Sequence, residues 1–198
     1  CKVSVIFETT NMGSMNDQPT NNIDSSNKDE TTFDDLLRRA IILHKQESIT
    51  EALELYRLAL KENPDHPEAL ILSGIVALQL NFLDEAVTNL SKVASMWSQD
   101  PVIHFKLGFA LDELGRFDEA VRSYERATMI VSDNPVIYSN LGNSLRKLGR
   151  LEDSILACRR AIEIQPNYAI AYQNLGVTLE SAGQFTEAID IFQRSIQI

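Results

Sequence analysis

The sequence predicts an all-α protein: a right-handed α-solenoid built from antiparallel helix pairs in units of 34 residues. One glycine column recurs at this spacing within segments of helical pattern: Gly74, Gly108, Gly142 and Gly176. Glycine costs roughly 0.5–1 kcal/mol relative to alanine inside a helix, so its return at a fixed period indicates close contact with a neighbouring helix. A second column closes the first half of three units: Gly115, Gly149 and Gly183. Self-similarity at such a period is typical of stacked supersecondary units.

Residues 1–32 are predicted to form a disordered leader ahead of the array. After a short apolar start, this segment is rich in Asn, Ser, Thr and Asp and shows no helical period. Such a composition buries too little apolar surface to fold, and the apolar start is too short for a secretory or membrane-spanning segment. Thr32 followed by Asp35 resembles a capping box with Asp in place of Glu. The first helix is therefore expected to begin near Phe33.

The first unit, which starts near residue 33, departs most from the pattern. Ala40 replaces the first glycine, and Glu47 replaces the turn glycine. Its second half nevertheless keeps the small and bulky residues of the later units and their closing proline: Ala52, Tyr56, Ala59 and Pro64. A terminal unit is expected to be atypical because one of its faces meets water.

The second, third and fourth units start near residues 67, 101 and 135, each of which is a proline. In the third unit, the apolar residues of the first helix share one broad face: Val102, Phe105, Phe109 and Leu111. Those of its second helix follow the same spacing: Ala120, Val121, Tyr124 and Ala127. A single pair of this kind cannot bury both faces, so neighbouring units must cover them.

Two replacements within these units keep the pattern. Asn81 stands where the later units have their turn glycine, and Asn is the next-best residue where φ must be positive. In the fourth unit, Ser154 and Cys158 take the small and bulky positions of the second helix. Cys158 is therefore predicted to be a small buried hydrophobe rather than a reactive thiol.

The fifth unit starts near Ala169 and is cut short at Ile198, within its second helix. Four apolar residues of that helix have no following unit to cover them: Ile191, Phe192, Ile196 and Ile198. Solenoids normally end in a polar capping helix. We therefore expect that the natural protein continues, or that this edge meets another chain or a second copy of this one.

Taken together, these columns resemble the tetratricopeptide repeat family over residues 33–198. In that family, a few positions of each first helix line a concave groove that binds extended peptides. By this resemblance, the candidate peptide-binding residues are Phe105, Lys106, Phe109, Asn140, Asn143, Arg146, Gln173 and Asn174. The resemblance also raises the chaperone-type carboxylate clamp, which is built from Lys and Asn residues. Only Asn140 of this sequence matches it.

Two features stand out among these candidates. Asn140 and Asn174 each precede Leu-Gly and resemble the asparagine ladder of the O-linked N-acetylglucosamine transferase superhelix, where amides hold a peptide backbone. A carboxamide suits that task because it offers both a donor and an acceptor. The ladder is incomplete, since earlier units carry Arg, Leu and Lys at this position. Phe105 and Phe109 are predicted to project into the groove one turn apart; the alternative is that they pack against the flanking helices.

One further column on the first helices is polar. Asp112, Arg146 and Glu180 share one unit position in successive repeats. They are predicted either to face the groove or to pair with one another across the helices, where an exposed pair contributes little.

Composition argues against several other classes of function. The formal net charge of −10 disfavours nucleic-acid binding, which requires a basic face. The sequence also shows no cationic amphipathic helix of the kind that binds a membrane surface. The three histidines are scattered and lack the spacing of metal ligands. Paired acidic residues such as Asp118 and Glu119 begin second helices, where they complement the helix dipole and are not expected to act as a catalytic pair. No catalytic residue, metal or cofactor is expected, and two distant cysteines fit a reducing, cytoplasmic setting.

The predicted function is therefore a non-enzymatic protein–protein interaction scaffold that binds an extended peptide or partner segment in its groove. A first alternative is the substrate-recruiting N-terminal arm of a larger O-linked glycosyltransferase or sulfotransferase, because the Leu-Gly-Arg turns at 114–116 and 148–150 resemble such arrays. A second alternative is a lipoprotein or assembly factor anchored through Cys1.

Overall fold

The computed structural model describes residues 32–97 and 99–198, and this part of the chain consists of α-helices without a strand. The helices form five antiparallel pairs: α1 (Phe33–Lys45) with α2 (Ile49–Glu62), α3 (Pro67–Gln79) with α4 (Leu83–Met96), α5 (Pro101–Glu113) with α6 (Phe117–Ile130), α7 (Pro135–Lys147) with α8 (Leu151–Ile164), and α9 (Ala169–Ser181) with α10 (Phe185–Gln197). The predicted all-α solenoid is confirmed. The predicted leader lies outside the described residues, except for Thr32.

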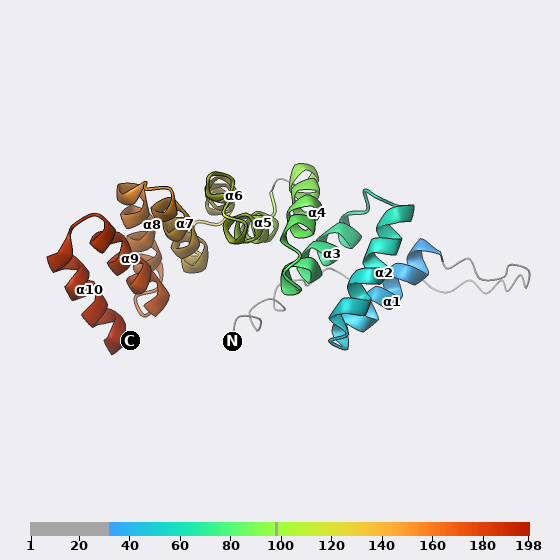
Figure 1. Ribbon diagram of the computed structural model, residues 1–198, viewed down its shortest axis with the longest axis horizontal. Helices are drawn as coiled ribbons and strands as arrows, with labels where there is room; N and C mark the ends of the chain where they lie inside the picture. Colours follow the sequence, from blue (N-terminus) through green and yellow to red (C-terminus); the bar gives the residue numbers. More distant parts are fainter. Residues whose placement is uncertain (1–31, 98) are drawn as a thin grey trace, which may run out of the picture.

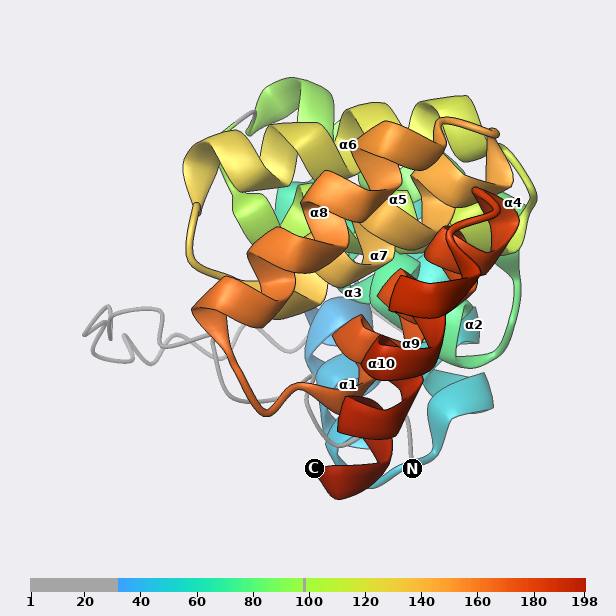
Figure 2. The ribbon, with the colours of Figure 1, turned by 90° about the vertical axis from the view of Figure 1, so that its left-hand side faces the viewer.

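The five pairs follow one another along the long axis of the molecule, from α1 at one end to α10 at the other (Figure 1). Each helix contacts the next one in the chain, and the first helices α7 and α9 also contact each other directly. The view along the axis shows α6 and α8 as an outer layer over α5 and α7 (Figure 2). In these two pairs the first helices therefore lie in one layer and the second helices in another.

Four of the first helices, α1, α3, α5 and α7, begin at side chains that accept hydrogen bonds from their orphan N–H groups, whereas α9 has no such cap. Thr32 Oγ1 accepts from the Asp35 amide at 3.3 Å, as the capping pattern predicts. Asp100 and Asn134 cap α5 and α7 in the same way, each followed by a proline at the first helical position. His66 caps α3 through Nδ1, which accepts from the Ala69 amide at 3.3 Å. This role for a histidine had no signal in the sequence.

Each turn within a pair passes through one residue of positive φ. Gly115, Gly149 and Gly183 supply it in the last three pairs, with φ between 74° and 78°. Asn81 (φ 62°) takes this place in the second pair, as expected, and Glu47 (φ 63°) takes it in the first. A glutamate in this conformation is strained, because its Cβ crowds the following carbonyl. The first pair therefore has the same turn geometry as the other pairs, although it lacks a glycine or asparagine at this position.

The helical glycine column marks the closest approach within each pair. A Cβ at Gly108 would lie 2.8 Å from the Tyr124 ring, and one at Gly142 would lie 2.5 Å from Cys158 Sγ. Three of the bulky residues opposite these glycines, Leu90, Tyr124 and Cys158, are fully or almost fully buried, and Phe192, opposite Gly176, is half-buried. Burial raises the pKa of the Cys158 thiol to about 12, which agrees with its predicted packing role. The fixed period of these glycines thus reports helix-to-helix contact.

Candidate peptide-binding groove

The eight candidate residues lie on α5, α7 and α9, the last three first helices. We call the surface formed by these residues the first-helix face. Neighbouring first helices contact each other along it, most extensively α7 with α9. The residues differ in burial and in the partners they already have, so each must be placed separately.

Phe105 and Phe109 supply the aromatic part of the first-helix face. Both side chains are half-buried, so each keeps part of its surface available to a ligand. The ring of Phe105 lies 6.0 Å from that of Tyr124, centroid to centroid, and packs against the main hydrophobic core. Phe105 therefore divides its surface between the core and the first-helix face, and the packing alternative holds for part of this side chain.

Lys106 lies between the two phenylalanines in sequence and is also half-buried. Within the described residues, no hydrogen bond or ion pair involves its ammonium group. Burial disfavours the charged form of the side chain and lowers the pKa of Lys106 below its usual value. This lysine is therefore a half-buried group whose charged form is disfavoured by burial.

The two ladder candidates, Asn140 and Asn174, make different contacts. Asn140 Nδ2 donates to the Val136 carbonyl within α7 at 2.9 Å. Asn174 Nδ2 instead crosses from α9 to α7 and donates to the carbonyl and the hydroxyl of Ser139, at 3.1 and 2.9 Å. One amide thus bonds within its own helix while the other joins two repeats, and the two side chains do not form a uniform row.

Arg146, Asn143 and Gln173 complete the polar part of the first-helix face. Arg146 Nη2 donates to Asn143 Oδ1 at 2.9 Å, and both side chains are half-buried. Gln173 is exposed. Together with the Asn side chains, these groups place several hydrogen-bond donors and acceptors at the C-terminal end of the array, beyond the apolar stretch on α5.

The predicted pairing among Asp112, Arg146 and Glu180 is not the one that forms. Asp112 pairs with Lys147 Nζ at 2.8 Å and accepts from Ser144 Oγ at 2.6 Å. Only 10% of the Asp112 side chain is exposed, against 31% of the Lys147 side chain, so the carboxylate is the buried partner of this ion pair. The same Lys147 ammonium lies 4.8 Å from the centroid of the Phe117 ring. Sequence reasoning missed these contacts because they span 35 residues (Lys147 to Asp112) and 32 residues (Ser144 to Asp112), and not the 34 residues of the repeat.

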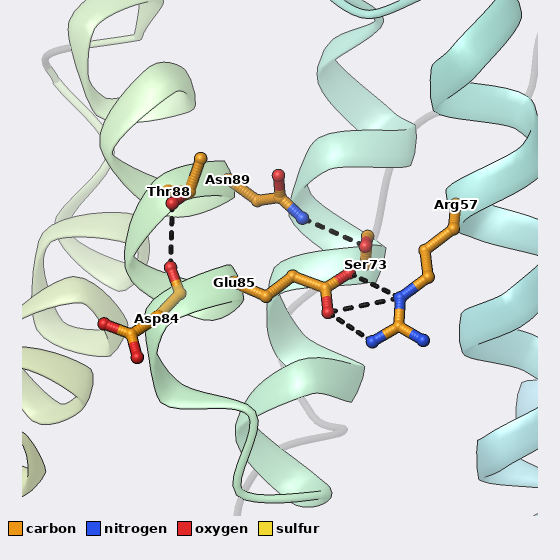
Figure 3. A network of polar contacts seen from close by, with 6 residues as sticks. All are labelled: Arg57, Ser73, Asp84, Glu85, Thr88 and Asn89. Carbon is orange, nitrogen blue, oxygen red and sulfur yellow. Dashed lines mark hydrogen bonds and ion pairs between the residues drawn. The ribbon is translucent and has the colours of Figure 1, made fainter.

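A second kind of site lies between the second helices. Arg57 of α2 donates to both carboxylate oxygens of Glu85 on α4, with Nε at 2.9 and 3.2 Å (Figure 3). At the equivalent position, Arg159 Nη2 of α8 donates to one carboxylate oxygen of Glu187 on α10, at 2.7 Å. The two intervening joints have Ser91 and Glu125 at the arginine position. Each of those joints instead holds a pocket, of about 260 Å³ beside Ser91 and about 290 Å³ beside Glu125.

These two pockets are repeats of each other. Apart from Ala94, every residue that lines the first has its counterpart 34 residues further on in the second. The signal was present in the sequence, as a position that holds arginine in the first and fourth units and Ser or Glu in the second and third. The role of this position became clear only when the structure showed that the arginine bridges two second helices.

Residues 32–97 and 99–198 contain no group of three or more His, Cys, Asp or Glu side chains arranged to hold a metal ion. Over the same residues, every helix is too short or too polar to cross a membrane.

Family comparisons agree with the geometry of the helix pairs. Models of the tetratricopeptide repeat match residues 37–101 and 133–198, and a TPR repeat model matches residues 111–149. The chain is a tetratricopeptide repeat protein. No curated protein matches the sequence.

Several solved structures share this fold. A crystal structure of MamA has a TM-score of 0.79 at 22% identity, over 84% of this chain and 91% of that one. MamA from Desulfovibrio magneticus RS-1 has a TM-score of 0.77 at 20% identity, over 83% and 93%. YrrB, described as a TPR protein with an unusual peptide-binding site, has a TM-score of 0.75 at 21% identity, over 82% and 84%. At these identities, the likeness is one of fold.

Proposed function

We propose that this tetratricopeptide repeat protein is an interaction scaffold that holds an extended peptide or a segment of a partner protein against its first-helix face. The observation that carries the proposal is the composition of that face. It combines half-buried aromatic surface on α5 with amide and guanidinium groups on α7 and α9. Peptide sites need such a mixture, because apolar pockets hold side chains while polar groups hold the backbone.

The roles of the eight residues follow from their contacts. Phe105 and Phe109 offer an apolar anchor site. The carbonyl oxygens of Asn140 and Asn174 accept backbone N–H groups, since each amide nitrogen already donates within the protein. Asn143, Arg146 and Gln173 extend the polar part, and Lys106 adds a cation. The peptide-binding site described for YrrB, which shares the fold, supports a ligand of this kind.

The test uses peptides selected from a displayed library of random 12-residue sequences against the whole chain. We expect Phe109→Ala and Asn140→Ala each to weaken a selected peptide several-fold in isothermal titration, because each removes one contact without touching the core. Phe82→Ala, at the exposed N-cap of α4 and outside the candidate residues, is the matched control and should leave affinity unchanged. Selected peptides that bind equally well to all three variants would overturn the placement of the site.

A second, separate proposal concerns α10: its apolar face associates with a second copy of the chain. Ile189 is 57% exposed, whereas Leu53, Val87, Val121 and Ile155, its counterparts in the other pairs, are buried by the next helix. Ile196 is 86% exposed. We expect the mass measured by light scattering to rise with concentration, and Ile189→Glu to keep the chain monomeric. A monomer at all concentrations would refute this association.

We propose no chemical step for this chain. The recruiting-arm and lipoprotein alternatives and the cytoplasmic location stay predictions of the sequence.

A further inference from the structure

Neighbouring second helices face each other at a repeated pair of positions, 28 residues apart. At the α2–α4 and α8–α10 joints, an arginine at the first position donates to a glutamate at the second: Arg57 to Glu85 (Figure 3) and Arg159 to Glu187. At the α6–α8 joint, the same two positions hold Glu125 and Asp153. Two carboxylates therefore stand where the other two joints have an ion pair.

The α6–α8 joint also contains the pocket of about 290 Å³ beside Glu125. We call it the outer pocket; α6, α7 and α8 line it, and α6 and α8 form the outer layer over α7 (Figure 2). Leu141 and Leu145 of α7 are buried and give it an apolar lining, and Tyr138 is half-buried beside them. The outer pocket thus combines hydrocarbon and an aromatic ring with carboxylates from two second helices.

The acids of the outer pocket are not fully matched by cations. Arg150 binds Asp153 through Nε and Nη2, but both donate to the same oxygen, Oδ2, at 2.8 and 2.7 Å. Arg160 pairs with Glu163 at 3.0 Å. Glu125 is half-buried, and its carboxylate has no hydrogen-bond or ion-pair partner among the described residues. The outer pocket therefore has one acid whose charge is uncompensated and a second acid with an oxygen to offer.

The equivalent pocket beside Ser91 has the opposite balance of charge. There Arg116 binds Glu119 through both carboxylate oxygens, at 2.7 and 2.8 Å. Arg122 and Arg126 also line that pocket. Cations thus outnumber acids beside Ser91, whereas the outer pocket has the unmatched acid.

Leu156 and Met129 are exposed apolar side chains at the outer pocket. Leu156 of α8 lines it and is 64% exposed, and Met129 of α6, one turn from Glu125, is 76% exposed. The other four units have polar residues at both positions: Glu54, Thr88, Arg122 and Asp190 for Leu156, and Lys61, Ser95, Glu163 and Gln197 for Met129. Apolar side chains that gather on the surface at one joint indicate contact with another protein.

We propose that the outer pocket binds an arginine side chain of a partner protein, whose guanidinium group bridges Glu125 and Asp153. At the α2–α4 and α8–α10 joints an arginine of the chain itself supplies this group, and here the partner supplies it. Arginine suits the pocket better than lysine, because its planar guanidinium donates to two carboxylates at once and its stem packs on hydrocarbon. An apolar residue beside that arginine packs on Leu156 and Met129. The net charge of −10 attracts a basic partner.

This inference goes beyond the proposed function, because Glu125 and Asp153 lie on second helices and not on the first-helix face. The test uses the whole chain and a displayed library of random 12-residue peptides, from which sequences that bind the Glu125→Arg variant are first removed. We expect the peptides that remain and bind the wild type to share an arginine beside an apolar residue. Replacing that arginine by citrulline, which is neutral and similar in shape, should weaken binding at least about tenfold in isothermal titration.

Variants of single acids separate a local ion pair from a general effect of charge. Glu125→Gln should reduce the discrimination between the arginine and the citrulline peptide to about threefold or less, because it removes the unmatched carboxylate. Glu152→Gln is the matched control, since it removes an exposed acid of α8 that does not line the outer pocket. It should keep the full discrimination, and an equal loss in both variants would overturn the site.

A measurement without peptide checks the geometry. Glu125→Arg should raise the melting temperature of the chain, because its guanidinium can pair with Asp153 as Arg57 pairs with Glu85. A melting temperature at or below that of the wild type would show that a guanidinium does not fit between these two helices, and would overturn the proposal.

The outcomes also keep this site apart from the first-helix face. Phe109→Ala should leave the affinity for the arginine peptide unchanged. Binding that needs Phe109 and not Glu125 would overturn the role of the outer pocket and leave the proposed function standing. A library that yields no arginine-containing sequence after the depletion step would overturn that role as well.

Discussion

At the scale of single residues, the strain in this protein is concentrated where one residue departs from the repeat. Glu47 occupies the turn position that glycine holds in the last three pairs, with the same positive φ. It is exposed, so its side chain contributes no packing to offset the strained backbone. A residue with a Cβ in this conformation costs roughly 1–2 kcal/mol.

We therefore expect Glu47→Gly to stabilise the chain by about 1 kcal/mol, since glycine adopts this backbone readily but loses more entropy on folding. Urea unfolding of the wild type and the variant, followed by circular dichroism, measures the difference. Glu47→Ala is the matched control, because it removes the carboxylate and keeps the Cβ. An equal gain from the alanine variant would mean that charge, and not backbone strain, is responsible.

The helical glycines differ in what stands opposite them. At Gly142, a Cβ would meet Cys158 Sγ at 2.5 Å and the Ser154 carbonyl oxygen at 3.3 Å, in a fully buried contact. At Gly176, it would meet the ring of Phe192, which is only half-buried at the α10 edge and has room to move.

We expect Gly142→Ala to destabilise the chain by roughly 1–3 kcal/mol, as overpacking does, and Gly176→Ala to cost less. Thermal unfolding of both variants compares them. Combining Gly142→Ala with Cys158→Ala should recover part of the loss, because the double variant removes the clash. Strict additivity in this double-mutant cycle would show that the two residues do not interact.

At the scale of elements, α1 departs most from the repeat pattern and also contains a buried histidine. His44 is 8% exposed, and its ring lies edge-on to that of Tyr56, with centroids 6.3 Å apart. Burial disfavours the imidazolium and lowers the pKa of His44 from its usual 6.5. Below about pH 6.5 the unfolded chain therefore binds more protons than the folded one, and stability falls as the pH decreases from there toward the folded pKa.

We expect hydrogen exchange in α1, corrected for intrinsic rates, to speed up between pH 7 and pH 5 more than it does in α5. His44→Leu should abolish this extra acceleration, since leucine fills the site without titrating. If the leucine variant keeps the same pH dependence, carboxylates elsewhere in the first pair are responsible.

At the scale of the whole molecule, stability is the sum of contacts between neighbours along the solenoid. The inner pairs are covered on both sides, but α10 is covered on one side, by α9 and by α8 through the Arg159–Glu187 pair, and has a single buried residue, Ala188. Local opening is easiest where few apolar contacts must be broken. The C-terminal helix should therefore open without the rest of the array.

We expect amide protection to be lowest in α10 and highest in α4 to α8, as measured by hydrogen exchange with mass spectrometry. Raising the protein concentration should protect α10 selectively if its apolar face binds a second copy. Uniform protection from α1 to α10 at low concentration would instead indicate a single cooperative unit.

The sequence by itself determined the helix pairs, their turns and their contact points. Turn residues such as Asn81 and close contacts such as Gly108 against Tyr124 repeat at a fixed interval, so a local pattern reports them. For the same reason the candidate residues could be assigned to the first helices. The sequence shows that Glu47 replaces the turn glycine, but only the structure shows that this residue keeps the positive φ.

Only the tertiary structure decided which polar groups meet. Asp112 pairs with Lys147 and not with Arg146, Asn174 bonds to Ser139, and Lys106 has neither an acceptor nor an anion among the described residues. These outcomes depend on how far one first helix is shifted and rotated against the next. That offset arises from side-chain packing over the whole seam, which a column of repeated residues does not encode.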